Sequence, residues 1–300
     1  MKEQMKFKNL SSQKNFSKNQ DYSLKDFLKL LDPENPKFKK IESLLHGSFS
    51  SNKTGIGFDF NEIREYKIGD DLRHISWITT AKTGVLHTKE YYAEKDITSF
   101  FLIDISNSIF CGNKSEPFFK LLAFLLNLSS SFSEKIGGLL FDNEIRFHFP
   151  LTQSQLQANL IFQTMLSIYR NLNNHVPNSG SYTNLSNALG LTKRYFQKKG
   201  IIFILSDFLN LSNWEKNIYE AAQNQNIYLF QIYDPLDFTL PNTGYVTIID
   251  PETKKLCTVN TDNKKIQETY KSLMIEKQEK LSKFLQTISI HHTTIKTTDF

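Results

Sequence analysis

The chain has little cysteine and no long hydrophobic run. Its two cysteines, Cys111 and Cys257, are too few for a disulfide framework and indicate a reducing compartment. The densest apolar run covers residues 121–126, far short of the roughly 20 residues that span a bilayer. No apolar segment follows the lysine-rich start, so no secretory signal is visible. From these absences we expect a soluble, cytoplasmic protein that does not insert into a membrane.

Several motifs that carry chemistry are also missing. No His-x-x-x-His or Cys-x-x-Cys spacing occurs, so the sequence does not support a zinc site. The sequence has no glycine-rich loop of the Walker type, and we do not expect it to hydrolyse nucleotides. The net charge of +5 is mild for 300 residues and comes from no dominant Lys/Arg block, which argues against nucleic-acid binding.

The residues that are present divide the chain into three parts. Residues 1–20 are rich in Lys, Asn, Ser and Gln and are interpreted as a disordered tail. Residues 21–96 are interpreted as an N-terminal segment packed on the main domain. The main domain is expected to cover residues 97–300, where the hydrophobic pattern changes to regular alternation.

The N-terminal segment shows three kinds of local pattern. A helical pattern over 24–45 is divided by Pro33 and Pro36, because proline breaks a helix interior. The composition of residues 47–57 predicts a loop. Residues 58–95 are dense in charged and aromatic side chains and have poor periodicity.

From residue 97 onward, strand patterns alternate with helix patterns. Strands are expected at 99–104, 136–141, 145–149, 201–206, 227–233, 244–249 and near 293–297. Helices are expected at 116–133, 152–173, 184–198, 213–225 and 262–289, the last as an amphipathic helix lying on the sheet. Asp142-Asn143 predicts a tight hairpin turn. The alternation predicts an α/β fold, doubly wound around a mostly parallel sheet.

Five oxygen-bearing side chains stand where predicted strands end or helices begin. Asp104 closes one strand and is followed by Ser106 and Ser108, whose spacing allows both hydroxyls to face the same side. Thr183 stands at a helix start, and Asp207 closes another strand. In an open α/β sheet, ligands bind beyond the carboxyl ends of the strands. Two carboxylates and three hydroxyls gathered there predict a site for a hard cation such as Mg²⁺.

Each of these residues also has a simpler interpretation. Asp104, Ser106 or Ser108 can cap the helix that begins near residue 116, or a turn before it. Thr183 and Asp207 likewise suit helix starts. The order in which all five occur favours the cation site over five separate caps.

That order resembles the von Willebrand factor A-like domain and its metal-ion-dependent adhesion site, over residues 97–300. The resemblance implies Mg²⁺ (or Mn²⁺) as the cofactor and an acidic side chain of a partner protein as the final ligand. One departure is Tyr182, which stands where a glycine often precedes the threonine. The resemblance implies three direct ligands and two surrounding carboxylates: Ser106, Ser108 and Thr183, then Asp104 and Asp207.

The region before this domain carries a second signature, which consists of Arg64, Tyr66, Gly69, Asp70, Asp71, Arg73 and Trp77. With this signature, the chain resembles the bacterial family known as domain of unknown function fifty-eight, over about residues 40–300. The departures are Ser76, Lys82 and Ile109, where the family usually has Asp, Arg and Met.

The signature also has a direct physical interpretation. The sequence Gly69-Asp70-Asp71 predicts a turn, because glycine adopts positive φ without strain. Arg64 and Arg73 are then expected to form charge-assisted bonds that hold this turn against Trp77. We interpret the signature as a structural clasp that ties the N-terminal segment onto the main domain, in preference to a direct partner-binding surface.

These features predict a non-enzymatic, metal-dependent protein-interaction module. The family resemblance implies a MoxR-type AAA+ ATPase as the partner, with this chain as its adaptor or co-chaperone-like factor. One alternative is a Mg²⁺-dependent phosphatase-like enzyme with Asp104 as nucleophile, although Ser106 stands where such enzymes need a second acid. Another is nucleic-acid binding through the basic N-terminus, which would depend steeply on salt.

Overall fold

The computed structural model describes residues 22–32, 34–49, 54–92, 97–171, 183–196, 199–209, 213–249 and 256–299. The predicted disordered tail, residues 1–20, and the departure at Tyr182 lie outside these residues. Within the described part of the chain, no helix is long and apolar enough to cross a membrane.

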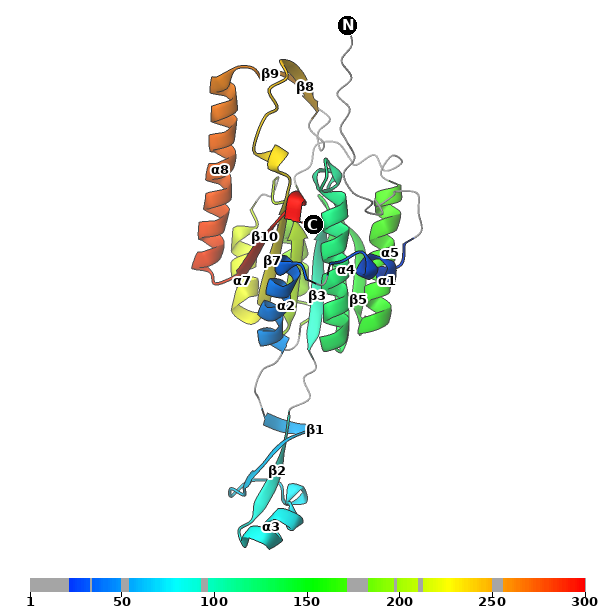
Figure 1. Ribbon diagram of the computed structural model, residues 1–300, viewed down its shortest axis with the longest axis vertical. Coiled ribbons are helices and arrows are strands. Elements are labelled where there is room, and N and C mark those ends of the chain that lie inside the picture. Colours follow the sequence, from blue (N-terminus) through cyan, green and yellow to red (C-terminus); the bar gives the residue numbers. More distant parts are fainter. Residues whose placement is uncertain are drawn as a thin grey trace.

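Strands and helices alternate through the main domain as the sequence pattern predicts (Figure 1). The α-helices are α1 (Leu24–Lys29), α2 (Pro36–Phe49), α3 (Trp77–Thr83), α4 (Ser115–Phe132), α5 (Ser154–Arg170), α6 (Leu185–Thr192), α7 (Glu215–Asn224) and α8 (Lys264–Thr287). The strands are β1 (Thr54–Glu65), β2 (His87–Tyr92), β3 (Thr98–Asp104), β4 (Lys135–Phe141), β5 (Ile145–Gln153), β6 (Ile201–Ser206), β7 (Asn226–Tyr233), β8 (Tyr245–Ile249), β9 (Leu256–Asn260) and β10 (His291–Lys296).

The main sheet has six strands in the order β10-β7-β6-β3-β4-β5. All neighbours are parallel except β4 and β5, which pair antiparallel across the predicted turn at Asp142-Asn143. The α/β fold with a mostly parallel sheet, predicted from the sequence, is therefore confirmed. Strand β3 lies between β6 and β4, so the side chains at its carboxyl end are surrounded by protein on both sides.

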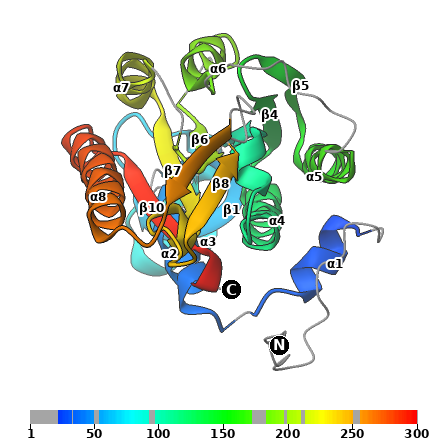
Figure 2. The same cartoon turned by 90° about the horizontal axis from the view of Figure 1, so that it is seen from above.

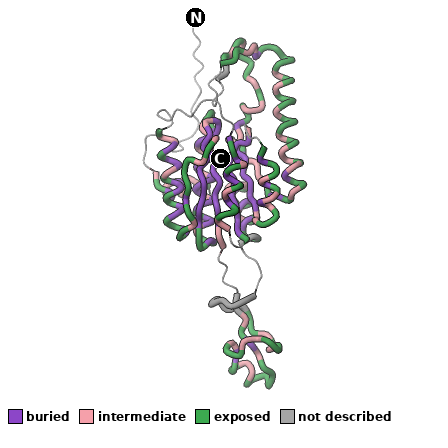
Figure 3. Tube along the Cα trace, turned by 180° about the vertical axis from the view of Figure 1, so that it is seen from behind, coloured by how far each residue is buried: buried purple, intermediate pink, exposed green. Residues whose placement is uncertain are grey.

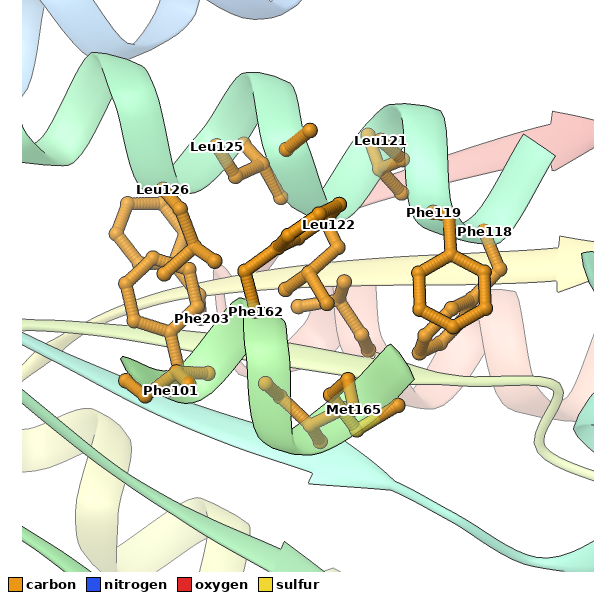
Figure 4. Close-up of a cluster of buried hydrophobic side chains, with 14 of the residues drawn as sticks. Phe101, Phe118, Phe119, Leu121, Leu122, Leu125, Leu126, Phe162, Met165 and Phe203 are labelled. Atoms are coloured by element: carbon orange, nitrogen blue, oxygen red, sulfur yellow. The ribbon is translucent and has the colours of Figure 1, made fainter. Parts of the chain in front are cut away.

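Helices cover both faces of this sheet (Figure 2). Alternate residues of β3 point to opposite faces. Phe101 joins the hydrophobic core under α4 and α5, whereas Phe100 joins the core under α6 and α7. In the first core, Phe101 stacks on Phe203 of β6 at 4.8 Å between ring centroids (Figure 4). Burial on both faces explains why β3 and β6 are continuous apolar runs without polar alternation (Figure 3).

The first two helices pack against the main domain. The Phe27 ring of α1 is fully buried, 5.2 Å from the ring of Phe162 and 5.9 Å from that of Phe119. Phe38 of α2 contacts Phe124 of α4 at 4.6 Å. Residues 22–49 therefore contribute to the same core as α4 and α5.

Residues 54–92 form a smaller unit made of the β1–β2 hairpin and α3. Figure 1 shows this unit beyond one end of the main sheet, whereas the sequence interpretation packed the whole segment 21–96 on the main domain. The ion pairs of its described side chains, such as the Arg64–Asp70 pair, join residues of the unit to one another. The domain boundaries after residues 20 and 96 stay a prediction.

Helix α8 corrects one expectation. It was predicted to lie along the sheet, but only its C-terminal end packs there, through residues such as Leu285. Leu273, in its middle, has 58% of its surface exposed. A helix of 24 residues is about 36 Å long, whereas strands of six to eight residues reach only about 20–26 Å. The sheet is too short to cover the helix, and Figure 1 shows the rest of α8 extending past it.

Three strands differ from the sequence expectation. Strand β1 begins at Thr54, within the stretch predicted as a loop, and pairs antiparallel with β2, which was not predicted either. Strand β9 was also not predicted and pairs with β8 outside the main sheet. All three depend on a partner strand for their hydrogen bonds, which single-strand periodicity does not reveal.

Candidate metal centre

Asp104 ends the central strand β3 and has only 1% of its surface exposed. Its Oδ1 accepts a hydrogen bond from the backbone N–H of Ser106 at 2.8 Å. Its Oδ2 accepts a hydrogen bond from the hydroxyl of Ser206 at 2.6 Å. Because Ser206 ends the neighbouring strand β6, the carboxyl ends of two parallel strands meet at this carboxylate. The site therefore begins where the sequence predicted it.

The two serines after Asp104 are brought together. Ser106 and Ser108 are buried, and their Oγ atoms lie 3.0 Å apart. Adjacent ligands of an octahedral ion bound at about 2.1 Å are separated by about 3 Å, so this spacing suits Mg²⁺. The side chains of the predicted site all offer carboxylate or hydroxyl oxygens, the ligand type that hard cations prefer. The side chains present therefore fit the cation that the sequence implies.

Asp207 follows β6 and is also buried. Its Oδ1 accepts a hydrogen bond from the backbone N–H of Leu209 at 3.2 Å, and its Oδ2 accepts one from the ammonium of Lys114 at 3.1 Å. The Lys114 ammonium also reaches the carboxylate of Asp237 at 3.2 Å. Asp207 is thus part of an ion-pair cluster, and its negative charge acts on Asp104.

Thr183 approaches from another side. It is buried immediately before α6, and the backbone N–H of the next residue, Asn184, donates to the carbonyl oxygen of Asp142 at 2.7 Å. Asp142 follows β4, the other neighbour of β3, so Thr183 lies at the same rim of the sheet. Within the described part of the chain, the Thr183 hydroxyl makes no hydrogen bond to the other four predicted residues.

The α-helix part of the cap interpretation is wrong, but Asp104 does cap a turn before α4, because its Oδ1 accepts the backbone N–H of Ser106. Helix α4 begins after Lys114 without a side-chain cap, although Asp104, Ser106 and Ser108 were all considered for that role. Helix α6 is capped by Asn184, whose side chain accepts from the backbone N–H of Asn187. Asp207 accepts from Leu209 in a turn ahead of α7, which begins after Trp214. The oxygens gather at the sheet rim without capping an α-helix.

Burial and neighbouring charges shift the pKa values of two residues in this cluster, Asp104 and Lys114. Burial raises the pKa of Asp104 to about 7, and the negative charge of Asp207 adds to the rise against the hydrogen bonds from Ser206 and Ser106. Burial alone would lower the pKa of Lys114, but the carboxylates of Asp207 and Asp237 outweigh it, so the net pKa is raised. Near neutral pH, Asp104 is therefore poised between its two forms while Lys114 stays charged.

The described residues contain no cluster of three or more His, Cys, Asp or Glu side chains able to hold a metal ion. A cation at the rim would therefore need hydroxyl ligands in addition to carboxylates. This requirement matches the predicted set, in which three of the five members are hydroxyls: Ser106, Ser108, Thr183, Asp104 and Asp207.

The structure adds three residues to this cluster that the sequence did not single out for it. Ser206 was identified only as the end of a predicted strand, and Asp237 and Lys114 were not identified at all. The segment Asp234-Pro-Leu-Asp237 matches the capping pattern of the short helix η3 (Pro235–Asp237), and this pattern is the one available signal. A lysine directly before an apolar helix gives no such signal.

The N-terminal signature forms the predicted ion pairs. Gly69 has a φ of 107°, as the turn requires, and Arg64 binds both oxygens of Asp70 at 2.7 and 2.9 Å. The hydrogen bonds from Arg64 hold the pKa of Asp70 down at about 2. Asp71 pairs with Arg73 at 2.6 Å. Trp77 is 68% exposed, so the expectation that the turn is held against it is wrong.

The fold and this rim define an α/β protein with a candidate cation site at the carboxyl end of a mostly parallel sheet. Residues 62–280 match the family described as "Protein of unknown function DUF58". The chain belongs to this family, and the membership inferred from the signature is confirmed.

Two mycobacterial relatives of this chain are described only as uncharacterized proteins. An uncharacterized protein of Mycobacterium bovis is 25% identical over 218 residues, which are 71% of this chain and 67% of that protein. An uncharacterized protein of Mycobacterium avium is 32% identical over 69 residues, 23% of this chain and 41% of that protein.

Solved structures give low similarity scores. The conserved hypothetical protein BatB from Bacteroides thetaiotaomicron has a TM-score of 0.43 and 15% identity, covering 67% of this chain and 90% of that chain. A von Willebrand factor type A protein from Catenulispora acidiphila has a TM-score of 0.34 and 14% identity, covering 48% of this chain and 34% of that chain. The fold described above rests on the strand order of this chain itself.

Proposed function

We propose that this chain is a non-enzymatic protein-interaction module that depends on Mg²⁺ (or Mn²⁺). The observation that carries the proposal is the meeting of Asp104 with Ser206 across 102 residues of sequence, beside the paired hydroxyls of Ser106 and Ser108. In the proposed site, Ser106, Ser108 and Thr183 would hold the cation. Asp104 and Asp207 would lie around it.

The chemistry of this set suits capture of an anion. Hydroxyl ligands are neutral, so a bound cation keeps most of its positive charge and attracts a further anionic oxygen. An acidic side chain of a partner protein is the proposed source of that oxygen. The protein holds the ligand oxygens in place through the backbone of β3 and β6 and through the hydrogen bonds to Asp104.

The proposed partner is a MoxR-type AAA+ ATPase, for which this chain would act as an adaptor or co-chaperone-like factor. This part of the proposal comes from the resemblance carried by the signature around Arg64 and Trp77. The test is capture of the purified ATPase from the same organism by this chain in Mg²⁺ and in EDTA. Binding in Mg²⁺ that EDTA abolishes is the expected result, whereas equal binding in both would contradict the metal-dependent mechanism.

The phosphatase alternative is less well supported by the geometry. Both oxygens of Asp104 already accept hydrogen bonds, from Ser106 and Ser206, and the side chain is buried. A nucleophile needs a free oxygen aligned with its substrate. Turnover of an aryl phosphate in Mg²⁺ that is lost in Asp104→Asn would overturn the non-enzymatic proposal.

The raised pKa of Asp104 makes the proposed Mg²⁺ affinity depend on pH. Below pH 7 the metal-free protein carries a proton on Asp104, and the cation has to displace it. One such proton weakens binding by about tenfold between pH 8 and pH 6. Calorimetric titration of Mg²⁺ at both pH values measures this change, and an affinity that is equal at the two would contradict it.

The same shift has a defined effect on the metal-free fold. Because the folded-state pKa of about 7 lies above the ordinary 3.8, the stability contributed by Asp104 is full below about pH 4 and is lost as the pH rises through 7. The melting temperature of wild type minus that of Asp104→Asn, both measured in EDTA, isolates this contribution because the other titrating groups cancel. Wild type should lose stability relative to the variant as the pH rises to about 7, and the difference should then level off.

A further inference from the structure

Lys114 is the least expected member of the rim cluster. It is a lysine with 2% of its surface exposed, at the residue before α4, and its side chain makes no helix cap. Lysine is almost never fully buried unless it is paired. Here the pairing is double, because the ammonium lies 3.1 Å from Asp207 and 3.2 Å from Asp237.

The two carboxylates that hold Lys114 differ in their surroundings. Asp207 belongs to the candidate cation site and acts electrostatically on Asp104. Asp237 belongs to η3, where its carboxylate also accepts the backbone N–H of Asp234 at 2.9 Å. The Asp237 carbonyl accepts the hydroxyl of Tyr270 from α8 at 2.9 Å. Asp237 is therefore fixed independently of Lys114 and of the candidate cation site.

We propose that Lys114 is a tethered competitor of the divalent cation. Its ammonium neutralises Asp207 when no cation is bound, and it gives up Asp207 while keeping Asp237 when a cation arrives. This inference rests on the proposed function, because it concerns the regulation of the same site. It implies that the chain binds its cation more weakly than the donor set alone would allow.

The size of the effect follows from charge. A unit positive charge next to a divalent cation in a buried site opposes binding strongly, so removing it is expected to tighten Mg²⁺ binding by at least about tenfold. Removing Asp237 is expected to weaken Mg²⁺ binding. Without this second carboxylate, Lys114 has no fixed anion other than Asp207, so its ammonium competes more strongly with the cation for Asp207.

A purely structural ion pair would behave differently. Loss of Lys114 would then lower the stability of the fold, because the buried carboxylate of Asp207 and the partly buried carboxylate of Asp237 lose their partner. The Mg²⁺ affinity of the folded protein would not rise. The direction of the affinity change therefore separates the two roles.

The experiment is calorimetric titration of the full chain with Mg²⁺, together with melting curves in EDTA and in Mg²⁺. The variants are Lys114→Met, Lys114→Gln and Asp237→Asn. The matched control is Lys120→Met, since Lys120 lies on α4 and pairs with Glu116, one turn earlier on the same helix. We expect Lys114→Met to bind at least about tenfold more tightly, Asp237→Asn to bind several-fold more weakly, and the control to match wild type.

We also expect Lys114→Met to melt at a lower temperature in EDTA and to regain stability in Mg²⁺. Unchanged or weaker binding by Lys114→Met overturns the inference while leaving the proposed function in place, provided that wild type binds. Absence of binding by wild type and by every Lys114 variant overturns the proposed function itself. If the Met variant does not fold, the Gln variant, which retains a polar group, is judged by the same criterion.

Discussion

Replacing Asp104 by asparagine is expected to weaken Mg²⁺ binding by at least about a hundredfold, because it removes a negative charge beside a divalent cation in a buried site. The amide has nearly the same shape, and it keeps a hydrogen-bond partner for Ser106 and for Ser206. It also resembles the protonated form of Asp104, which is well populated near pH 7. The variant should therefore fold with undiminished stability in EDTA while losing the cation, as measured by calorimetry and thermal melting.

Asp142 provides a matched control for this experiment. It follows β4 at the same rim, but its carboxylate pairs with Arg146 at 2.9 Å and is not a predicted ligand. Asp142→Asn should bind Mg²⁺ as wild type does. If Asp104→Asn kept its affinity, or if the two variants lost affinity equally, the cation would not be bound at the proposed position.

Phe119→Ala is expected to lower the free energy of unfolding by about 3–5 kcal/mol. The ring is fully buried on α4, with ring centroids 5.9 Å from Phe27, 5.8 Å from Phe118 and 6.0 Å from Phe162. Its removal leaves a cavity between α1, α4 and α5 that these rings cannot fill without moving. Chemical denaturation followed by circular dichroism measures the loss.

The control for this core variant is Leu156→Ala on α5, whose side chain is 70% exposed. It should change the free energy of unfolding by no more than about 0.5 kcal/mol. A loss below about 1 kcal/mol for Phe119→Ala would mean that the three helices do not share one core. The comparison also tests whether α1, which contributes Phe27, belongs to the main domain.

The fold of the main domain was largely predictable because its strands are buried on both faces. Such strands give continuous apolar runs, as in 201–206, and the intervening helices are long enough to show their period. The predictions failed where a partner decides the structure. Strand β1 needs β2, and the packing of α8 depends on the length of the sheet, which no local pattern encodes.

The candidate site was predictable to a similar degree. Asp104 and Asp207 could be placed at one rim because the ends of parallel strands lie together. Lys114 could not be placed, because its buried ammonium is stabilised by Asp207 and Asp237, which are 93 and 123 residues away in sequence. Whether an isolated lysine is buried depends on anions that only the folded chain brings to it.

The position of β3 between β4 and β6 has a consequence for synthesis on the ribosome. Asp104 leaves the ribosome well before Ser206, its hydrogen-bond partner 102 residues later. At translation rates of 5–20 residues per second, that interval lasts about 5 to 20 s. During this time the nascent chain has Asp104 but lacks β6 and Asp207. Acquisition of the ion would therefore be a late event, available only to chains whose translation has passed the sixth strand.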